Sequence, residues 1–532
     1  MIFDQSHDYV IVGGGSSGCA LAARLSEDPS VDVLLIEAGG RGDSWVVNTP
    51  TAGVFQIPTS LNNWAFETVP QAGLNGRRGY QPRGRALGGS SAINAMVYVR
   101  GHRADYDHWA ALGNPGWSFE DLLPLFIKNE CNERLGAPWH GQDGPLKVSD
   151  LRTDSPLHQA WLDAGRAMGL KLTDDFNGPE QEGIGVYQVT QHEGERWSAA
   201  RAYIEPNRHR PNLHVITGAQ VERVLFDGRR AVGVQMRLGG PRVQIQARRE
   251  VVLSAGALQT PQLLMLSGVG PGAHLQDLGI PVLHHLPGVG QNLQDHPDFV
   301  HGYLSDSLDT VGISLKGGVR LAQNIARYQR ERRGMISSNF AECGGFLKTR
   351  PELALPNVQL HFVVALVNDH ARELGLGHGL SCHVCLLRPS SRGSVRLAGP
   401  RVEDRPLIDP AFLADPADVD ELVEGFKLSR ELMRQPSLRA FWTRELWQAQ
   451  AGTDDEIRAL LRRRVDTVYH PVGSCRMGRD PMAVVDAELR VHGLQGLRVV
   501  DASIMPTLIG GNTNAPCMVI GEKAALMMRA RH

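Results

Sequence analysis

Residues 8–15 read DYVIVGGG, residues 16–28 read SSGCALAARLSED, and residues 31–40 read VDVLLIEAGG. The first and third stretches are short apolar runs that predict buried strands, and the second has the apolar spacing of a helix. A strand, a glycine-rich turn, a helix and a second strand make a βαβ unit, which feeds a parallel sheet. These residues therefore predict an α/β domain of the Rossmann type.

The turn between the first strand and the helix fits the pattern G-x-G-x-x-G, with Gly13, Gly15 and Gly18 at its fixed positions. The first glycine permits the tight turn, the second lets the backbone approach a pyrophosphate, and the third allows close helix–strand packing. Glu37 lies 19 residues beyond Gly18, at the end of the second strand, where a carboxylate can accept hydrogen bonds from ribose hydroxyls. The turn predicts a dinucleotide site without distinguishing NAD from FAD.

The size and charge of the chain narrow the class of protein. A chain of 532 residues exceeds one ordinary core, so we expect two or more domains. Lys+Arg 55 against Asp+Glu 57 gives a net charge of −2, so no strong field recruits nucleic acid, and no nucleic-acid partner is expected. The basic runs at residues 327–333 and 462–464 are either solvated helix faces or a patch that docks a partner or an anionic lipid surface.

Strand and helix patterns in the C-terminal half predict a second sheet. Residues 357–367, 379–387 and 393–397 are strand-like, and residues 417–433 have the spacing of an amphipathic helix. Because these stretches separate motif-rich, glycine-rich segments, we expect a substrate domain inserted twice into a discontinuous nucleotide-binding domain. The nucleotide-binding domain is expected to comprise residues 1–155, 198–300 and 465–532, and the substrate domain residues 156–197 and 301–464.

The N-terminus, the apolar runs and the cysteines bear on location and redox state. The first strand begins near Tyr9, which leaves no room for a secretory signal, and no window of about 18 apolar residues predicts a membrane span. We expect a cytoplasmic protein, with peripheral contact at the cytoplasmic membrane as an option. Seven cysteines predict free thiols, and Cys382 and Cys385 would lie on opposite faces of a strand, so no metal site is expected.

Four further blocks, in this order, resemble signatures of the glucose–methanol–choline (GMC) oxidoreductases. They are residues 84–94 (GRALGGSSAIN), 256–261 (GALQTP), 469–473 (YHPVG) and 510–516 (GGNTNAP). Within the family, the chain is most similar to choline-dehydrogenase-like and alkane-pathway alcohol dehydrogenases. The resemblance implies a Rossmann-like FAD-binding domain with an inserted sheet-and-helix substrate domain.

The resemblance also implies which residues hold FAD. The residues expected at the cofactor are Gly13, Gly15, Ser16, Ser17, Gly18, Glu37, Ala38, Gly89, Asn94, Ala95, Met96, Val97, Val221, Asp501, Ala502, Asn512 and Thr513. Some family members link FAD covalently through a histidine of the first signature. This chain has Ile93 there, which cannot form that bond, so we expect non-covalent FAD.

The resemblance places the catalytic base at His470, one of 20 histidines in the chain. A neutral imidazole can take the hydroxyl proton of an alcohol at physiological pH. Asn512 and Asn514 both qualify as the group that binds the alcohol oxygen. Counting back from residues 520–525 favours Asn512, and Asn514 is then expected to cap the following helix.

The expected activity is oxidation of a primary alcohol to an aldehyde, with hydride transfer to flavin N5 and electrons passed to a quinone-type acceptor. An oxidase that uses O₂, a choline dehydrogenase and, more remotely, a non-redox hydroxynitrile lyase are the alternatives. His361 is either a substrate-cavity residue or a core sheet histidine. Asn339 and Glu342 are further pocket candidates, and Val468 suits a dehydrogenase or an oxidase. The oligomeric state stays open.

Overall fold

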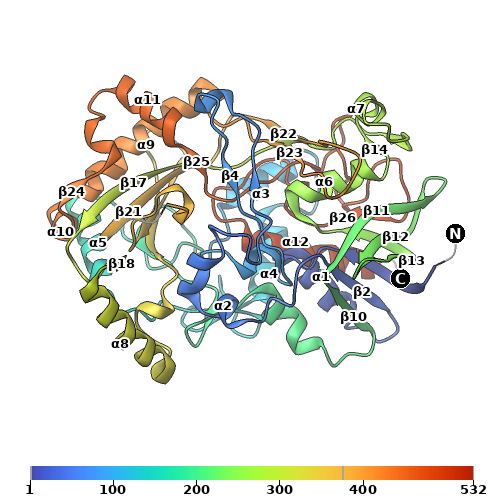
Figure 1. Cartoon of the computed structure of the whole chain (residues 1–532), viewed down its shortest axis with the longest axis horizontal. Helices are drawn as coiled ribbons and strands as arrows, with labels where there is room; N and C mark the ends of the chain where they lie inside the picture. Colours follow the sequence, from blue (N-terminus) through green and yellow to red (C-terminus); the bar gives the residue numbers. More distant parts are fainter. Residues whose placement is uncertain (1–2, 374–376, 531–532) are drawn as a thin grey trace.

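The computed structural model describes residues 3–373 and 377–530, and two large β-sheets stand at its two ends (Figure 1). The sheet on the right in Figure 1 contains strands β1, β2, β10–β13 and β26, and the sheet on the left is built around β17 and β21. The predicted α/β fold with a Rossmann-like part and a second sheet-and-helix part is confirmed.

The first sheet has the order β10–β2–β1–β13–β12–β11, with β26 also paired to β13. Its parallel part comprises β10 (Leu213–Thr217), β2 (Val33–Glu37), β1 (Gln5–Val12), β13 (Arg242–Leu253) and β26 (Leu497–Val499). β11 (Ala219–Asp227) and β12 (Arg230–Leu238) extend it as an antiparallel meander that the sequence did not predict. The carboxyl ends of β1 and β2 carry Gly13 and Glu37 to the same edge, where dinucleotides bind in this fold.

Two helices pack side by side against this sheet. α1 (Ser16–Leu25) follows the glycine-rich turn as predicted, and α12 (Asn514–Arg529) comes from the far end of the chain. A Cβ atom on Gly521 of α12 would lie 2.4 Å from the carbonyl oxygen of Ser17, so only glycine permits this approach of the two helices. The two helix N-termini therefore start next to each other.

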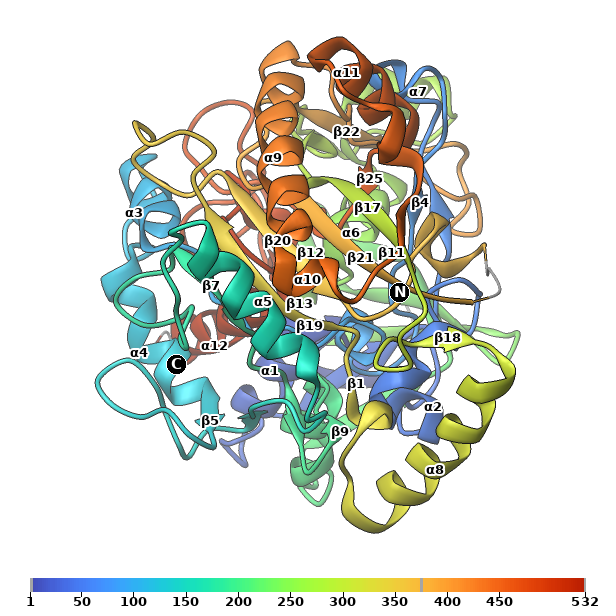
Figure 2. The ribbon, with the colours of Figure 1, turned by 90° about the vertical axis from the view of Figure 1, so that its left-hand side faces the viewer.

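The second sheet is antiparallel, with the order β24–β17–β21–β20–β19–β7. Its central strands are β17 (Pro297–Ser305), β21 (Gly377–Leu386), β20 (Val358–Val363) and β19 (Ala341–Leu347), and its edges are β24 (Arg444–Glu445) and β7 (Gly183–Val186). The short strands β18 (Gly312–Ile313) and β25 (Asp466–Thr467) join β21 and β17. α9 (Pro416–Arg434) and α5 (Pro156–Ala167) cover one face (Figure 2).

The strands and the helix predicted in this half are confirmed, and the pleat of the strands separates two environments. Leu380, Cys382 and Val384 of β21 belong to the apolar core beneath α9, whereas His383 faces a cavity on the opposite side. Cys382 and Cys385 thus lie on opposite faces as expected. The seven cysteines are free thiols.

We propose that the two domains correspond to the two sheets. β7 lies within residues 156–197 and the strands of the first sheet lie within the expected nucleotide-binding segments. β17 begins at Pro297, so the junction expected at residue 300 falls inside a strand of the second sheet. The sheet assignment therefore favours a junction just before β17. No helix among the described residues has the length and apolar character needed to cross a membrane.

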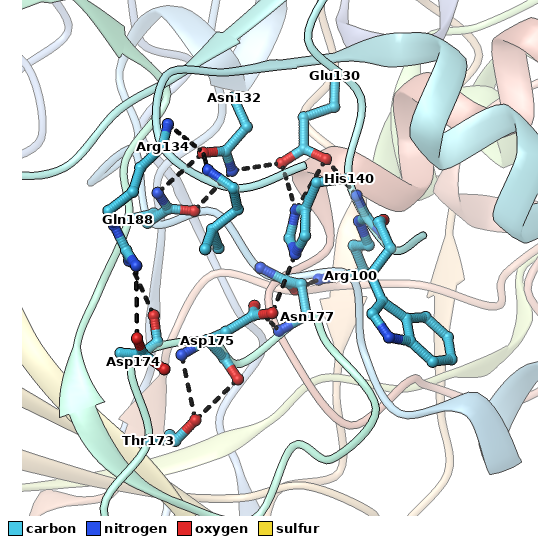
Figure 3. Close-up of polar contacts among 12 residues, drawn as sticks. Arg100, Glu130, Asn132, Arg134, His140, Thr173, Asp174, Asp175, Asn177 and Gln188 are labelled. Carbon is cyan, nitrogen blue, oxygen red and sulfur yellow. Dashed lines mark hydrogen bonds and ion pairs between the residues drawn. The ribbon is translucent and has the colours of Figure 1, made fainter. Parts of the chain in front are cut away.

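A cluster of charged side chains links the loops that carry Arg100, Glu130, His140 and Asp175 (Figure 3). His140 contacts Glu130 through Nδ1 at 3.0 Å and Asp175 through Nε2 at 3.0 Å, and Glu130 also pairs with Arg100. Both imidazole nitrogens therefore face carboxylate acceptors, so both must carry hydrogens. Burial opposes this charge, but the hydrogen bonds to Asp175 and Glu130 outweigh it and raise the pKa of His140.

Replacing His140 by Gln is expected to destabilise the fold by about 3 kcal/mol at pH 6, because it leaves Asp175 without its histidine cation and Glu130 with Arg100 alone. A raised pKa means that the stabilisation is complete below about pH 6.5 and is lost as the pH rises through the folded-state value. The difference in thermal unfolding midpoint between the wild type and His140→Gln should therefore shrink from pH 6 to pH 9. His209→Gln, at an exposed site, is the control and should change little. A difference that grows with pH would contradict the charged state of His140.

Candidate active site

A cavity of about 1490 Å³ lies between the two sheets. One end is lined by the glycine-rich turn, β11 and the start of α6 (Gly256–Leu266), and the other by β19, β20 and the segment after β25. Ordinary ligand pockets hold about 300–1,000 Å³, so this cavity has room for a large cofactor together with a substrate.

The glycine-rich turn has the geometry that its sequence predicts. Gly13 has a φ of +106°, and a Cβ atom on Gly18 would lie 2.0 Å from the carbonyl oxygen of Gly13. Gly15 lines the cavity, and a Cβ atom on Gly89 would lie 2.6 Å from the Gly15 Cα atom. The glycine-rich turn and residues 84–94 thus meet backbone to backbone at this wall, and a side chain at Gly89 would collide with Gly15.

Two buried carboxylates stand at the same end of the cavity. Glu37 accepts hydrogen bonds from the amides of Gly14 at 3.0 Å and Gly39 at 2.7 Å, and burial raises the pKa of Glu37 to about 7. Asp501 accepts from the Gly256 amide at 2.8 Å and from the Thr260 hydroxyl at 2.6 Å. Both carboxylates line the cavity. Glu37 keeps lone pairs that can receive a ligand hydroxyl, whereas Asp501 also accepts from the Ser503 amide at 2.8 Å and the Ser503 hydroxyl at 2.5 Å, so its acceptor positions are occupied.

The N-termini of α1 and α12 both open onto the cavity. Ser16, Ser17, Thr513 and Asn514 line it, and the first-turn amides of a helix have no partner within the helix. Together the two helix ends offer amide donors and a positive dipole end to an anion. Asn514 does not cap α12, contrary to expectation. It is the first helical residue, after Thr513 as N-cap, and its Oδ1 accepts a hydrogen bond from the Ser16 hydroxyl at 2.7 Å.

A buried arginine forms hydrogen bonds with residues 91–97, which line one wall of the cavity. Arg196 donates to the backbone oxygen of Asn94 at 2.7 Å, to its side-chain oxygen at 2.8 Å and to the Ser91 carbonyl at 3.1 Å. Burial lowers the pKa of Arg196 to about 9. Its side-chain partners within the described chain are uncharged, so this wall carries a cation without a paired carboxylate. No sequence pattern indicated this role of Arg196.

His470 lies at the opposite end of the cavity, and its ring contacts a second histidine. The Nδ1 atoms of His470 and His296 are 3.0 Å apart, and His296 Nε2 lies 3.0 Å from the Leu387 carbonyl oxygen and 3.1 Å from that of Ile509. Carbonyl oxygens only accept hydrogen bonds, so His296 Nε2 must carry the hydrogen. Burial lowers the pKa of His296 to about 3, so its ring is neutral and its Nδ1 is an acceptor. His470 must therefore donate from Nδ1, which leaves a lone pair on its Nε2.

The side-chain amide of Asn512 donates a hydrogen bond to that lone pair. Its Nδ2 lies 3.3 Å from His470 Nε2, and its Oδ1 accepts a hydrogen bond from Gln359 Nε2 at 2.9 Å. Gln359 thus fixes the orientation of the Asn512 amide, whose second Nδ2 hydrogen can bind another oxygen. Asn512 and His470, which are 42 residues apart in the sequence, are brought together as predicted.

The electrostatics favour a neutral His470. Burial, reinforced by His296, His361 and Arg83, holds the pKa of His470 well below its usual value. The position of the ring is set through its backbone, because the His470 amide donates to Asp295 at 2.9 Å. Asp295 also accepts from the Thr467 hydroxyl at 2.6 Å, which anchors the preceding strand.

Three of the four pocket candidates line the cavity. His361 lies on the cavity face of β20, and its Nδ1 is buried without a partner among the described residues. Asn339 lines the cavity and donates to the Ala95 carbonyl at 2.8 Å. Val468 also lines the cavity, two residues before His470. Glu342 was a wrong prediction. It follows Ala341, which faces the cavity, so its own side chain points to the other face and contacts His158 of α5 at 2.7 Å.

All the residues expected at FAD line the cavity except Gly18, whose place is the helix–strand contact. His296, Gln359, Asp295 and Arg196 were missed. Of these four, only His296 has a sequence signal, and it is weak. His296 precedes Pro297 as His470 precedes Pro471, and a following proline favours an extended backbone at both histidines.

The sequence and the structure match known proteins over nearly their whole length. Two patterns described as GMC oxidoreductase match residues 7–298 and residues 389–521. An alcohol dehydrogenase [acceptor] of Pseudomonas putida is 46% identical over 98% of this chain and 95% of its own. An oxygen-dependent choline dehydrogenase of Pseudomonas entomophila is 43% identical over 99% of this chain and 94% of its own.

Solved structures agree with these matches. Pyridoxine 4-oxidase of Mesorbium loti superposes with a TM-score of 0.89 and 34% identity, over 99% of this chain and 100% of its own. Formate oxidase of Aspergillus oryzae superposes with a TM-score of 0.92 and 28% identity, over 100% of this chain and 99% of its own. The cavity with its glycine-rich wall, the histidine pair and these matches lead to one conclusion: the chain belongs to the GMC oxidoreductase family.

Proposed function

We propose that this GMC oxidoreductase oxidises a neutral primary alcohol to an aldehyde, with His470 as the base and FAD as the hydride acceptor. Members of the family are flavin enzymes that act on CH–OH donors, and this chain is such an enzyme. The observation that carries the proposal is the lone pair on His470 Nε2, directed into the cavity next to the Asn512 amide.

The residues present at the glycine-rich end fit FAD. Gly15 and Gly89 leave backbone exposed to the cavity, and the amides at the starts of α1 and α12 suit a pyrophosphate. The Glu37 carboxylate suits hydroxyl groups of the ribose, and Asp501 holds the Gly256 amide and Ser503 in place at the same wall. We propose that the FAD is not covalently attached, because Ile93 lines the cavity at the position of the family's linking histidine.

The chemistry of the protein groups follows from their protonation. Bound flavin supplies the hydride acceptor, N5. His470 Nε2 has the lone pair that can take the hydroxyl proton of the alcohol once the hydroxyl replaces Asn512 Nδ2 as its hydrogen-bond donor. The Nδ2 hydrogens of Asn512 can then hold the oxygen as negative charge grows on it. An amide does not titrate, so Asn512 keeps this role at every pH at which the fold persists.

The acidic residues of the cavity favour a neutral substrate over choline. The carboxylates that line the described cavity are Glu37 and Asp501, which are bonded to amides, and Glu373, which lies in an exposed segment. Glu342, a pocket candidate whose carboxylate would suit a choline ammonium, points away. The choline dehydrogenases among the relatives keep choline as the second candidate.

The proposal predicts that a neutral primary alcohol bleaches the flavin absorbance of the anaerobic holoenzyme, and that choline does so much more slowly. His470→Ala should slow this reduction by about 10²- to 10⁴-fold, because no base remains, while FAD stays bound. His383→Gln, a cavity histidine bonded to Asp298 rather than to Asn512, is the matched control and should lose far less. Fast reduction in His470→Ala, or a preference for choline, would contradict the assignment.

Mixing the reduced enzyme with air then distinguishes an oxidase from a dehydrogenase with a quinone-type acceptor.

His296 is expected to act as a positioning residue through the tautomer of His470. His296→Leu removes the Nδ1 acceptor, so the proton of His470 is no longer held on its Nδ1, and kcat should fall by about 10²-fold or more with KM less affected. His296→Asn can still accept at its Oδ1 and should recover part of the rate. In the wild type, kcat/KM should stay level as the pH falls to about 6.5, since the pKa of His470 is lowered. Equal losses in both variants would argue for a purely structural role.

Non-covalent attachment predicts that acid precipitation of the holoenzyme leaves yellow flavin in the supernatant. Ile93→His adds a nucleophile at the linking position and serves as the comparison. Flavin that stays with the wild-type pellet would show that another residue forms the bond.

A further inference from the structure

An exposed apolar surface surrounds the outer opening of the cavity. Of 15 large hydrophobic side chains that are exposed among the described residues, eight lie in two short segments. The segment of α2 (Trp45–Asn48) and η1 (Pro50–Phe55) contributes Trp45, Val54 and Phe55. The segment of β18 and α8 (Leu315–Glu331) contributes Ile313, Leu315, Val319, Leu321 and Ile325. We call these eight residues the apolar rim.

Helix α8 packs on the protein through its polar side. Arg320 contacts Asp309 at 2.7 Å, Arg327 contacts Asp154 at 2.8 Å, and Asn324 accepts from the Met335 amide at 3.1 Å. Tyr328 is the buried residue of the helix, and its hydroxyl donates to the Gly194 carbonyl. At 3.6 residues per turn Leu315 and Val319 lie on the side away from Tyr328 and point outward, whereas Leu321 and Ile325 lie nearer the side of Tyr328, toward the cavity.

This orientation reverses the usual arrangement of an amphipathic helix. A surface helix normally buries its apolar stripe and leaves its charges in water. Here Leu315 is 96% exposed and Val319 is 64% exposed, while Arg320 and Arg327 are paired with the body. A contiguous exposed apolar patch is uncommon in a soluble monomer and marks a surface that is covered by something else.

The two segments of the rim lie on either side of the opening. α2 and α8 are neighbours in both ribbon views, and η6 (Met335–Ser337) lies between them, held to η1 by the Thr51 hydroxyl on the Ile336 carbonyl at 3.2 Å (Figures 1 and 2). Trp45 and Phe55 on one side, and Leu321 and Ile325 on the other, also line the cavity. The cavity therefore opens within the apolar rim.

We propose that the apolar rim docks onto a lipid bilayer, with α8 lying in the plane of the interface and the cavity opening toward the lipid. An amphipathic helix with an outward apolar side, next to an exposed tryptophan and phenylalanine, is the composition of an interfacial membrane anchor. A second copy of the chain seated on this surface would close the opening through which substrate and product must pass. A bilayer leaves it accessible to molecules dissolved in the lipid.

The attraction in this docking is apolar rather than electrostatic. The basic run at residues 327–333, considered as a patch for anionic lipid, is largely paired: Arg327 and Arg333 with Asp154, and Arg332 with Glu195. These arginines are thus already paired with carboxylates of the protein itself. The docking should thus be insensitive to salt and to lipid charge. If the proposed function also holds, alcohols and electron acceptors that partition into lipid reach the site without crossing water; the docking itself does not depend on that function.

Flotation of the holoenzyme with vesicles of pure phosphatidylcholine tests the docking. The wild type should float with the vesicles at both about 0.15 M and about 0.5 M salt, because screening does not weaken apolar burial. The double variant Leu315→Gln/Val319→Gln should lower the vesicle partition coefficient by about tenfold or more. Leu112→Gln/Leu283→Gln, at exposed sites outside the rim, is the matched control and should float like the wild type. Leu315 and Val319 do not line the cavity, so the double variant should keep its rate of reduction by a short water-soluble alcohol.

Absence of wild-type flotation, equal flotation of the rim variant, or flotation that needs anionic lipid and disappears in salt would overturn the proposal. A second measurement places the contact: a polarity-sensitive fluorophore on Leu315→Cys should shift to the blue with vesicles, and the same label on Leu112→Cys should not. Sedimentation without lipid identifies the rival arrangement. A wild-type dimer that the rim variant dissociates, without vesicle binding, would assign the surface to a second copy of the chain.

Discussion

Two backbone carbonyls, those of Leu387 and Ile509, determine the protonation of the proposed base. They fix the hydrogen of His296 on Nε2, and this fixes the hydrogen of His470 on Nδ1. Leu387 follows β21 of the second sheet, and Ile509 lies just before α12, which packs on the first. The reactive tautomer of His470 therefore exists only when the two sheets are docked, and the interface between them is part of the catalytic apparatus.

The same interface explains why the site can be both buried and polar. Its polar side chains are held in fixed orientations by neighbours from other elements, as Gln359 holds Asn512 and Asp295 holds the His470 backbone. A buried polar group that already has its partner needs little reorganisation when charge develops next to it. The burial that lowers the pKa of His470 also keeps the ring uncharged until a substrate supplies the proton.

The sequence was informative where a local pattern determines the outcome. The spacing around Gly13 and Gly18 predicted a turn whose backbone contacts leave no room for a side chain at those two positions. Apolar periodicity predicted β20, β21 and α9 with nearly correct ends. Family resemblance predicted that His470 and Asn512 meet, although nothing local relates them.

What the sequence did not predict depends on which way a side chain faces in three dimensions. Glu342 was expected in the pocket, but a bulge in β19 at residues 341–343 turns it toward His158. Asn514 was expected to cap a helix, but it is bonded to Ser16 from the other end of the chain. Likewise, the amphipathic pattern of α8 does not reveal that the polar side faces inward, because that depends on Asp154 and Asp309 elsewhere in the chain.

The histidine pair also limits where the substrate proton can go. Once His470 holds a hydrogen on each nitrogen, Nδ1 remains engaged with His296, whose own hydrogen points at two carbonyl oxygens that cannot take a proton onward. The histidine pair therefore cannot pass the proton on through His296. The proton must leave from Nε2, back through the space that the proposed aldehyde product would occupy, so the proposed base is reset only after that product has moved away.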